Sequence, residues 1–385
     1  MKVKFYILPV IIIAQFFCTS LWFAGNAVID DLVAQLNPGF NILGYMLSFV
    51  QFGFIIGSLL FALLTLADRF SPSRIFLICA VLGGISNLSL LIPNISIINL
   101  LTARFATGLF LAGIYPIGMK IASDYYKDGL GKALGYLVGA LVLGTAFPHF
   151  INEFSWSSDY KVVILSTSIL AWIGGIAIFI FVPDGPYRKP VQKLQLNVIT
   201  ALFEIPNFKK SAIGYFGHMW ELYAFWAFIP VFIQAYRNQQ LLALKISFWS
   251  FVCIAVGLVS CIIGGYISSR TGSKKVAYNS LLLSGIFCLC SPMLFYLSPE
   301  LFLGLLCIWG MVVISDSPQF STMVANAAPA ELRGTALTIA NCIGFAITII
   351  SIQLLTFLAE TIAIQYLYMP LSFGPLVGIY ILQRK

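Results

Sequence analysis

Twelve long apolar segments are the feature that most limits what this chain can fold into. A helix needs about 20 apolar residues to cross the hydrocarbon core of a bilayer, and most of these segments contain no Lys, Arg, Asp or Glu. They lie at 5–28, 42–66, 73–92, 97–123, 133–151, 162–182, 211–235, 246–268, 276–296, 301–325, 335–358 and 362–382. The pattern predicts an all-α membrane protein with twelve transmembrane helices.

Charge is too scarce for a protein that faces water on all sides. Charged residues make up 9% of the chain, against about 25% in soluble domains. The sequence has no Gly-x-x-x-x-Gly-Lys-Ser/Thr loop for a nucleotide, and its eight cysteines fall within the apolar segments without the spacing of metal ligands. We therefore expect no cofactor, no metal site, no disulfide framework and no enzymatic activity.

The formal net charge of +8 follows membrane topology rather than a nucleic-acid partner. With a cytoplasmic N-terminus, seventeen Lys and Arg residues lie on the cytoplasmic side and only Lys161, Arg237 and Lys245 on the other. This excess predicts both termini in the cytoplasm and an even number of spans. We expect a multi-pass monomer in the cell inner (plasma) membrane, with lipid, a small-molecule substrate and a coupling ion as its partners.

A charged, proline-rich segment divides the spans into two sets of six, and landmarks repeat between the sets. The matching pairs are Arg69 with Arg270, Pro116 with Pro318, and Gly131 with Gly334. Offsets of 201 to 203 residues across six spans predict two halves with the same orientation. The predicted domains are an N-terminal half at 1–183, a linker at 184–210 and a C-terminal half at 211–385.

Two loops and one helix resemble the major facilitator superfamily. The loop at 265–275, after the eighth span, is similar to that family's Gly-Asp-Arg-Gly-Arg/Lys signature, with Ser269 where Asp is common. Arg104-x-x-x-Gly108-x-x-x-Ala112 in the fourth span resembles a second motif. The resemblance implies parallel six-helix halves around a central cavity lined by spans one, four, seven and ten.

Loops of this kind gate the cytoplasmic side in that family. The loop after the second span keeps the Asp-Arg pair of the signature, which lies where one helix ends and the next begins, so the pair can cap helix carbonyls through its arginine and bridge the two helices. The gating residues that the resemblance implies are Asp68, Arg69, Arg74, Arg270, Lys274 and Lys275. Ordinary positive-inside charges are the alternative interpretation.

Ionisable side chains at membrane depth are costly, so they tend to line cavities and serve a function. Here they are Arg104, Lys120, His149, His218, Glu221 and Asp316. Five of the six fall on spans that the resemblance assigns to the cavity. His218 and Glu221 are three residues apart on one helix face, which predicts a hydrogen-bonded proton-coupling pair. A structural polar clamp to a neighbouring helix is the alternative.

Spans four and ten each carry a proline among polar residues. Proline frees a backbone carbonyl, which suits a ligand-facing kink. Lys120 follows Pro116, whereas Asp316 precedes Pro318 and Gln319. A pairing of Lys120 with Asp316 in one transport state is one hypothesis, and a static ion pair is the other.

Span one contributes Trp22 and Asn26, and span seven contributes Tyr223 and Trp226. These side chains predict part of a binding wall for an organic substrate, with anchoring at the membrane interface as the alternative. In the fifth span Phe147 stands where proton antiporters of the family carry Gly before Pro, so antiport is not favoured over symport.

These features predict a secondary active transporter that moves a small polar or charged organic solute across the inner membrane by alternating access. Protons are favoured over sodium as the coupling ion because His218, Glu221 and Asp316 can all titrate. Drug or metabolite efflux by proton antiport and siderophore import are the alternatives, and a non-transporting membrane receptor is a third.

Overall fold

The computed structural model describes residues 4–36, 41–126, 130–154, 159–188 and 198–384. Across these residues the regular elements are helices, with no β-strand among them. Contacts divide the chain into two compact units, Met1–Lys193 and Leu194–Lys385, and each is described by itself. The division falls inside the segment predicted as a linker.

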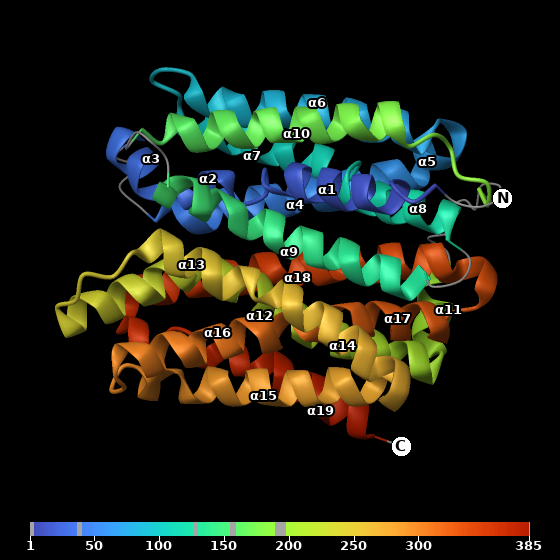
Figure 1. The fold of residues 1–385 in the computed structure, drawn as a ribbon. Coiled ribbons are helices and arrows are strands. Elements are labelled where there is room, and N and C mark those ends of the chain that lie inside the picture. Colours follow the sequence, from blue (N-terminus) through green and yellow to red (C-terminus); the bar gives the residue numbers. More distant parts are fainter. Residues whose placement is uncertain (1–3, 37–40, 127–129, 155–158, 189–197, 385) are drawn as a thin grey trace. The chain divides into compact units, whose positions relative to one another are not determined.

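The N-terminal unit begins with a first span that is broken into short helices (Figure 1). Its elements are α1 (Ile7–Thr19), α2 (Ala24–Ala27), α3 (Ile29–Leu36), α4 (Ile42–Leu63), α5 (Leu66–Arg69), α6 (Pro72–Leu88), α7 (Ile97–Leu111), α8 (Tyr115–Tyr125), α9 (Leu130–Phe154) and α10 (Lys161–Phe181).

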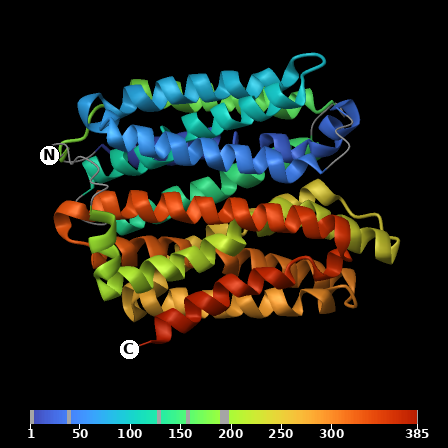
Figure 2. The same cartoon turned by 180° about the vertical axis from the view of Figure 1, so that it is seen from behind.

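The C-terminal unit is built around one long helix, α12. Its elements are α11 (Ile199–Glu204), α12 (Pro206–Gln240), α13 (Ile246–Ala255), α14 (Gly257–Thr271), α15 (Ser273–Leu294), α16 (Pro299–Ser315), α17 (Ser317–Ala327), α18 (Arg333–Thr361) and α19 (Phe373–Gln383). Figure 2 shows the red α18 alongside the yellow-green α12, and α19 and α17 also pack on α12. More of α12 is buried than of any other spanning helix in the described chain.

The predicted fold class is confirmed, whereas the count of twelve spans is not. Among the described residues, eleven helical stretches are long and apolar enough to cross a membrane, and the shorter apolar helix α1 precedes them. Their ends differ from the predicted ones by at most five residues. The difference lies in the first predicted span, because α1 ends at Thr19 and α2 begins only at Ala24.

Each unit contains a close helix contact that depends on glycine. In the N-terminal unit α7 packs on α4 (Figure 1), and a Cβ atom at Gly108 would lie under 3.0 Å from the carbonyl oxygen of Val50. In the C-terminal unit a Cβ at Gly310 of α16 would lie equally close to the carbonyl oxygen of Cys253 on α13. Glycine lets two helix backbones approach at such points. The glycines are 202 residues apart and their partners 203, the same offsets as the sequence repeat.

Candidate functional site

Three ionisable side chains meet inside the C-terminal unit. His218 and Glu221 lie on α12, and Asp316 lies at the junction of α16 and α17. Each is at most 1% exposed. One nitrogen or oxygen atom from each side chain, of the kind that can bind a metal ion, lies within 4.8 Å of the other two. We call these three residues the buried triad. The sequence placed two of them on one helix face, and the packing of α17 against α12 adds the third.

The closest contact within the buried triad joins His218 to Asp316. Nδ1 of the imidazole is 2.8 Å from Oδ1 of the carboxylate, an ion pair whenever the ring is protonated. Among the described residues no hydrogen bond of good geometry is formed by the ring nitrogens or by the Asp316 oxygens. The hydrogen bond predicted between His218 and Glu221 is therefore not formed, and Asp316 is the closer neighbour.

Two side chains of α15 hold one oxygen of Glu221. Ser284 donates from Oγ to Glu221 Oε2 over 2.7 Å, and Cys288 donates from Sγ to the same oxygen over 3.6 Å. Trp309 in turn donates from Nε1 to Ser284 Oγ over 3.2 Å. The other oxygen, Oε1, is buried and has no hydrogen-bond partner in the described part of the chain. Oε1 is thus the Glu221 atom left for a proton, a cation or a solute group.

The interruption between α16 and α17 explains how Asp316 reaches α12. α16 ends at Ser315 and α17 begins at Ser317, with Pro318 in its first turn, where a missing N–H costs nothing. The Phe320 N–H donates to the Asp316 carbonyl over 2.9 Å, so Asp316 caps the new helix with its backbone and keeps its carboxylate for the interior. Gln319, on the same turn, is also buried.

The buried triad combines two acids and a base away from water. Imidazole and carboxylate groups bind and release protons, and the same nitrogen and oxygen atoms have the spacing at which a small cation can be held. No metal site was expected from the sequence, because residue spacing along the chain gives no ligand pattern. The third ligand group comes from a distant helix, which no local motif records.

Arg104 of α7 binds the backbone where the first span is broken. The residue is 1% exposed, and its guanidinium donates to the carbonyl oxygens of Leu21 (3.3 Å) and Trp22 (2.5 Å) and to Asn87 Oδ1 (3.4 Å). The two carbonyls follow α1, where helical hydrogen bonding stops and acceptors need new donors. In this geometry Arg104 anchors the broken part of the first span. A role of Arg104 in binding substrate or in coupling stays a prediction.

We expect Arg104→Lys to lower the thermal stability of the purified protein. Lysine has no planar fork and cannot reach acceptors on two sides at once. Hydrogen bonds to charged groups are each worth about 1.5–3 kcal/mol, so the loss of one or more should lower the unfolding free energy by about 2 kcal/mol. Thermal unfolding in detergent measures this, with Arg270→Lys at an exposed position as the control. Unchanged stability of Arg104→Lys would exclude this anchoring role.

Lys120 and Asp316 belong to different compact units. Within the N-terminal unit, Lys120 Nζ lies 3.5 Å from Asp124 Oδ1, one turn further along α8. Within the C-terminal unit, Asp316 contacts His218. Each charge therefore has an oppositely charged or protonatable neighbour in its own unit, and the pairing across the halves stays a prediction.

The aromatic residues predicted for the site are all buried. Tyr223 packs edge-to-face on Trp226 with ring centroids 5.4 Å apart, and also on Phe345 of α18 at 5.3 Å. In the N-terminal unit Trp22 packs on Phe54 of α4 at 4.9 Å. Because at most 3% of Trp22, Tyr223 or Trp226 is exposed, these side chains do not act as anchors at the membrane surface.

Buried amides of the N-terminal unit are further candidates for substrate contact. Asn26, which was predicted for the site, is 4% exposed, and neither polar atom of its side chain has a hydrogen-bond partner among the described residues. Gln15 of α1 and Gln51 of α4 share both properties. Gln51 was not predicted for the site, because a neutral amide in an apolar segment gives a weaker signal than a charge.

The first predicted gating loop is held by residues of the predicted linker. Arg188 pairs through Nη1 with Asp184 Oδ2 at 2.9 Å and donates from Nη2 to the carbonyl oxygen of Phe70 at 2.7 Å. Ser71 donates from Oγ to Asp184 Oδ1 over 2.7 Å. Arg188 thus binds a carbonyl at the end of α5, where the sequence predicted capping by Asp68 and Arg69.

The other gating residues are at the surface of their units. The exposed side chains are those of Arg69, Arg74, Arg270, Lys274 and Lys275. The side chain of Asp68 lies outside the described part of the structure. A gating role for these six residues stays a prediction.

Apolar spanning stretches in two helical units and a buried cluster of ionisable side chains define a polytopic helical membrane protein. The sequence profile of the Major Facilitator Superfamily matches residues 11–352, and the chain belongs to this family. A relative from Bacillus subtilis (strain 168), the uncharacterized MFS-type transporter YceJ, is 22% identical over 84% of this chain and 80% of its own length. The crystal structure of the human organic anion transporter MFSD10 (TETRAN) aligns over the whole of both chains with a TM-score of 0.72 at 12% identity, which supports the fold.

Proposed function

We propose that this member of the Major Facilitator Superfamily is a secondary active transporter that couples solute movement to protons through the buried triad. Its cargo is a small polar or charged organic solute, moved across the inner membrane by alternating access, with both termini in the cytoplasm. Family membership supports transport. The observation that carries the coupling is the cluster of His218, Glu221 and Asp316, closed off from water with 2.8 Å between imidazole and carboxylate.

The charge balance of the buried triad supports coupling to a proton. An imidazolium compensates one carboxylate, so the fully ionised triad retains one uncompensated negative charge. An unpaired charge is costly in a site without water, and a proton on the remaining carboxyl removes that cost. When the site opens to water, the ionised carboxylate is hydrated and the proton is released more easily. Loading with a proton is thereby tied to closure, which is the linkage that a coupled transporter requires.

The substrate class is the less constrained half of the proposal. Human MFSD10, which shares the fold, is an organic anion transporter. In the present chain Arg104 is engaged by backbone carbonyls, which argues against an anion site dominated by Arg104. Unpartnered buried amides at Asn26 and Gln51 instead suit a solute with groups that both donate and accept hydrogen bonds.

A ligand screen tests the proposed function directly. The purified protein is heated in detergent at two pH values with metabolites that include organic anions, zwitterions, polyols and siderophores. A ligand at a hundred times its dissociation constant stabilises the folded state by about 2.7 kcal/mol, which a melting curve resolves. Uptake into proteoliposomes under an imposed pH or sodium gradient then follows for each hit.

The two gradients separate the alternatives. We expect accumulation under the pH gradient and none under sodium alone. Accumulation that requires sodium would show that Na⁺, and not a proton, is the coupling ion bound at the buried triad. Solute extrusion driven by an inward proton gradient would identify an antiporter. A specific ligand without any flux would favour a receptor and contradict the transport proposal.

A further inference from the structure

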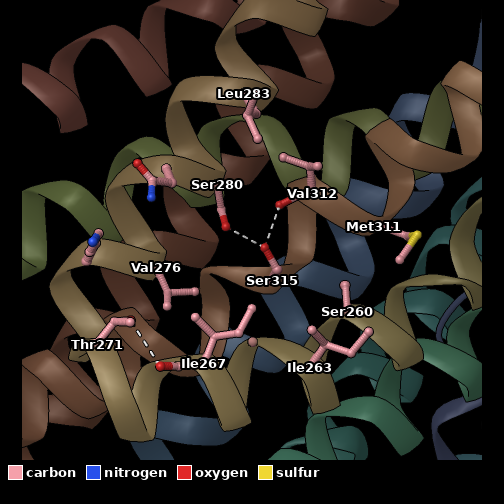
Figure 3. Close-up of a pocket in the computed structure, with 13 residues that line it drawn as sticks. Ser260, Ile263, Ile267, Thr271, Val276, Ser280, Leu283, Met311, Val312 and Ser315 are labelled. Atoms are coloured by element: carbon pink, nitrogen blue, oxygen red, sulfur yellow. Dashed lines mark hydrogen bonds between the residues drawn. The ribbon is translucent and has the colours of Figure 1, made fainter.

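A groove of about 290 Å³ opens on the C-terminal unit between α14, α15 and α16 (Figure 3). Its walls include Ile263, Ile267 and Leu283, whose side chains are each close to half exposed. Its floor is made of small residues, and Ser280 Oγ and Ser315 Oγ form a hydrogen bond of 2.5 Å there. Apart from Thr271, Lys275 and Asn279, the groove is lined by apolar or small residues, and the hydroxyls of Ser280 and Ser315 are bonded to each other.

The exposed apolar walls of the groove are expected to face lipid, the medium that surrounds membrane-spanning helices. All three helices that form it belong to the apolar spanning stretches. Along α15 the lining runs from Lys275 to Leu283, about 12 Å at a rise of 1.5 Å per residue. An unfilled groove of this size forfeits dispersion contacts, and a flexible acyl chain can restore them. Its length and apolar walls suit part of one such chain.

One end of the groove carries positive charge. Lys275 is exposed and lines the groove, and Arg270 and Lys274 flank the turn at Gly272 beside it. None of the residues that line the described groove is acidic. Basic residues at the end of a spanning helix attract the headgroups of anionic lipids. The expected topology places this end in the cytoplasmic leaflet, where such headgroups are found.

We propose that this groove binds one anionic phospholipid, with an acyl chain along Ile263, Ile267 and Leu283 and its phosphate at Lys275. The apolar walls select the chain, and the charge at one end selects the headgroup. A zwitterionic lipid would fill the same walls but would gain less at Lys275. An apolar transport substrate would not use the lysine at all.

The site lies next to the elements that present the buried triad. Ser315 on the floor directly precedes Asp316. Ser280 is one turn from Ser284, which donates to Glu221 Oε2. A bound acyl chain therefore supports α15 and the end of α16, the two segments that position both carboxylates. Lipid composition is in this way connected to the transport site through packing.

Lipid retention measured by native mass spectrometry tests the proposal without any knowledge of the transported solute. The protein is incubated in detergent with phosphatidylglycerol or with phosphatidylcholine of the same acyl chains. Val312→Phe places a ring in the groove, and Val312→Ala at the same position is its matched control. Lys275→Gln removes the charge, with Lys209→Gln on α12 as a control lysine that does not line the groove.

We expect wild-type protein to retain one phosphatidylglycerol and to prefer it to phosphatidylcholine. Val312→Phe should lose this lipid, and Lys275→Gln should retain about fivefold less, the effect of one basic residue at a lipid surface. Equal retention of both lipids, or full retention by Lys275→Gln, would overturn the anionic site. Full retention by a folded Val312→Phe would place the lipid elsewhere, and if that variant does not fold, Lys275→Gln alone decides.

Discussion

In a Glu221→Gln variant we expect gradient-driven accumulation of the solute to disappear while solute exchange continues. Glutamine keeps the size of the side chain, and its carbonyl oxygen can still accept from Ser284. It cannot take up a proton at this position. A pH gradient of one unit supports about tenfold accumulation for one proton per solute, since 1.4 kcal/mol is a factor of ten. The variant should return this ratio to about one.

Paired assays in proteoliposomes separate coupling from binding. Accumulation under an imposed pH gradient is compared with exchange of labelled against unlabelled solute at equal pH. Glu331→Gln, at an exposed position, removes an acid outside the buried triad and should behave as wild type in both assays. Full accumulation by Glu221→Gln would remove Glu221 from coupling. Loss of both activities would indicate that Glu221 binds the solute or supports the fold.

Ser284→Ala distinguishes the position of the carboxyl group from its chemistry. This variant removes the 2.7 Å hydrogen bond to Glu221 Oε2 but leaves the carboxyl group able to take a proton. Accumulation should persist at a reduced rate, with its pH dependence displaced from that of wild type. An Ala variant as inactive as Glu221→Gln would mean that the orientation set by α15 is as necessary as the proton itself.

Most of the spans were predictable from the sequence because lipid imposes a simple rule. A spanning helix must be apolar over its whole length, so its ends can be found from composition alone. The breaks in spans four and ten were marked by Pro116 and Pro318, and both prolines lie in the first turn of a new helix. The break in the first span has no proline, and it was missed.

The arrangement of the candidate site was only partly predictable. Charges inside apolar segments identified His218, Glu221 and Asp316, because such charges are rare and costly. Their pairing depends on how α17 packs on α12, which no local pattern specifies. Ser284 was not singled out, since a serine in an apolar helix is common and its importance comes from the neighbour it contacts. The partners of Arg104 were hidden for the same reason, because they are two backbone carbonyls and a neutral amide.

The largest loss of stability is expected from Gly310→Ala on α16. A methyl group at this position would lie under 3.0 Å from the carbonyl oxygen of Cys253, which belongs to the backbone of α13 and cannot turn aside. Overpacking costs about 1–3 kcal/mol where side chains can adjust, so displacement of a whole helix should cost at least about 3 kcal/mol. Gly304→Ala on the same helix has no atom within 4 Å of its new methyl group. It should be neutral or stabilising by about 0.5–1 kcal/mol, the helix propensity of alanine over glycine.

Thermal unfolding of the two variants in one detergent gives the comparison, and Gly108→Ala extends it to the N-terminal unit. Equal losses in Gly310→Ala and Gly108→Ala would show that the close approach belongs to the repeated unit and was kept in both copies. A stable Gly310→Ala protein would mean that α13 and α16 can separate, and the contact would then not limit the fold. Loss in Gly304→Ala as well would trace the effect to glycine within α16 in general. Only the first outcome connects the repeat in the sequence to a shared constraint on backbone packing.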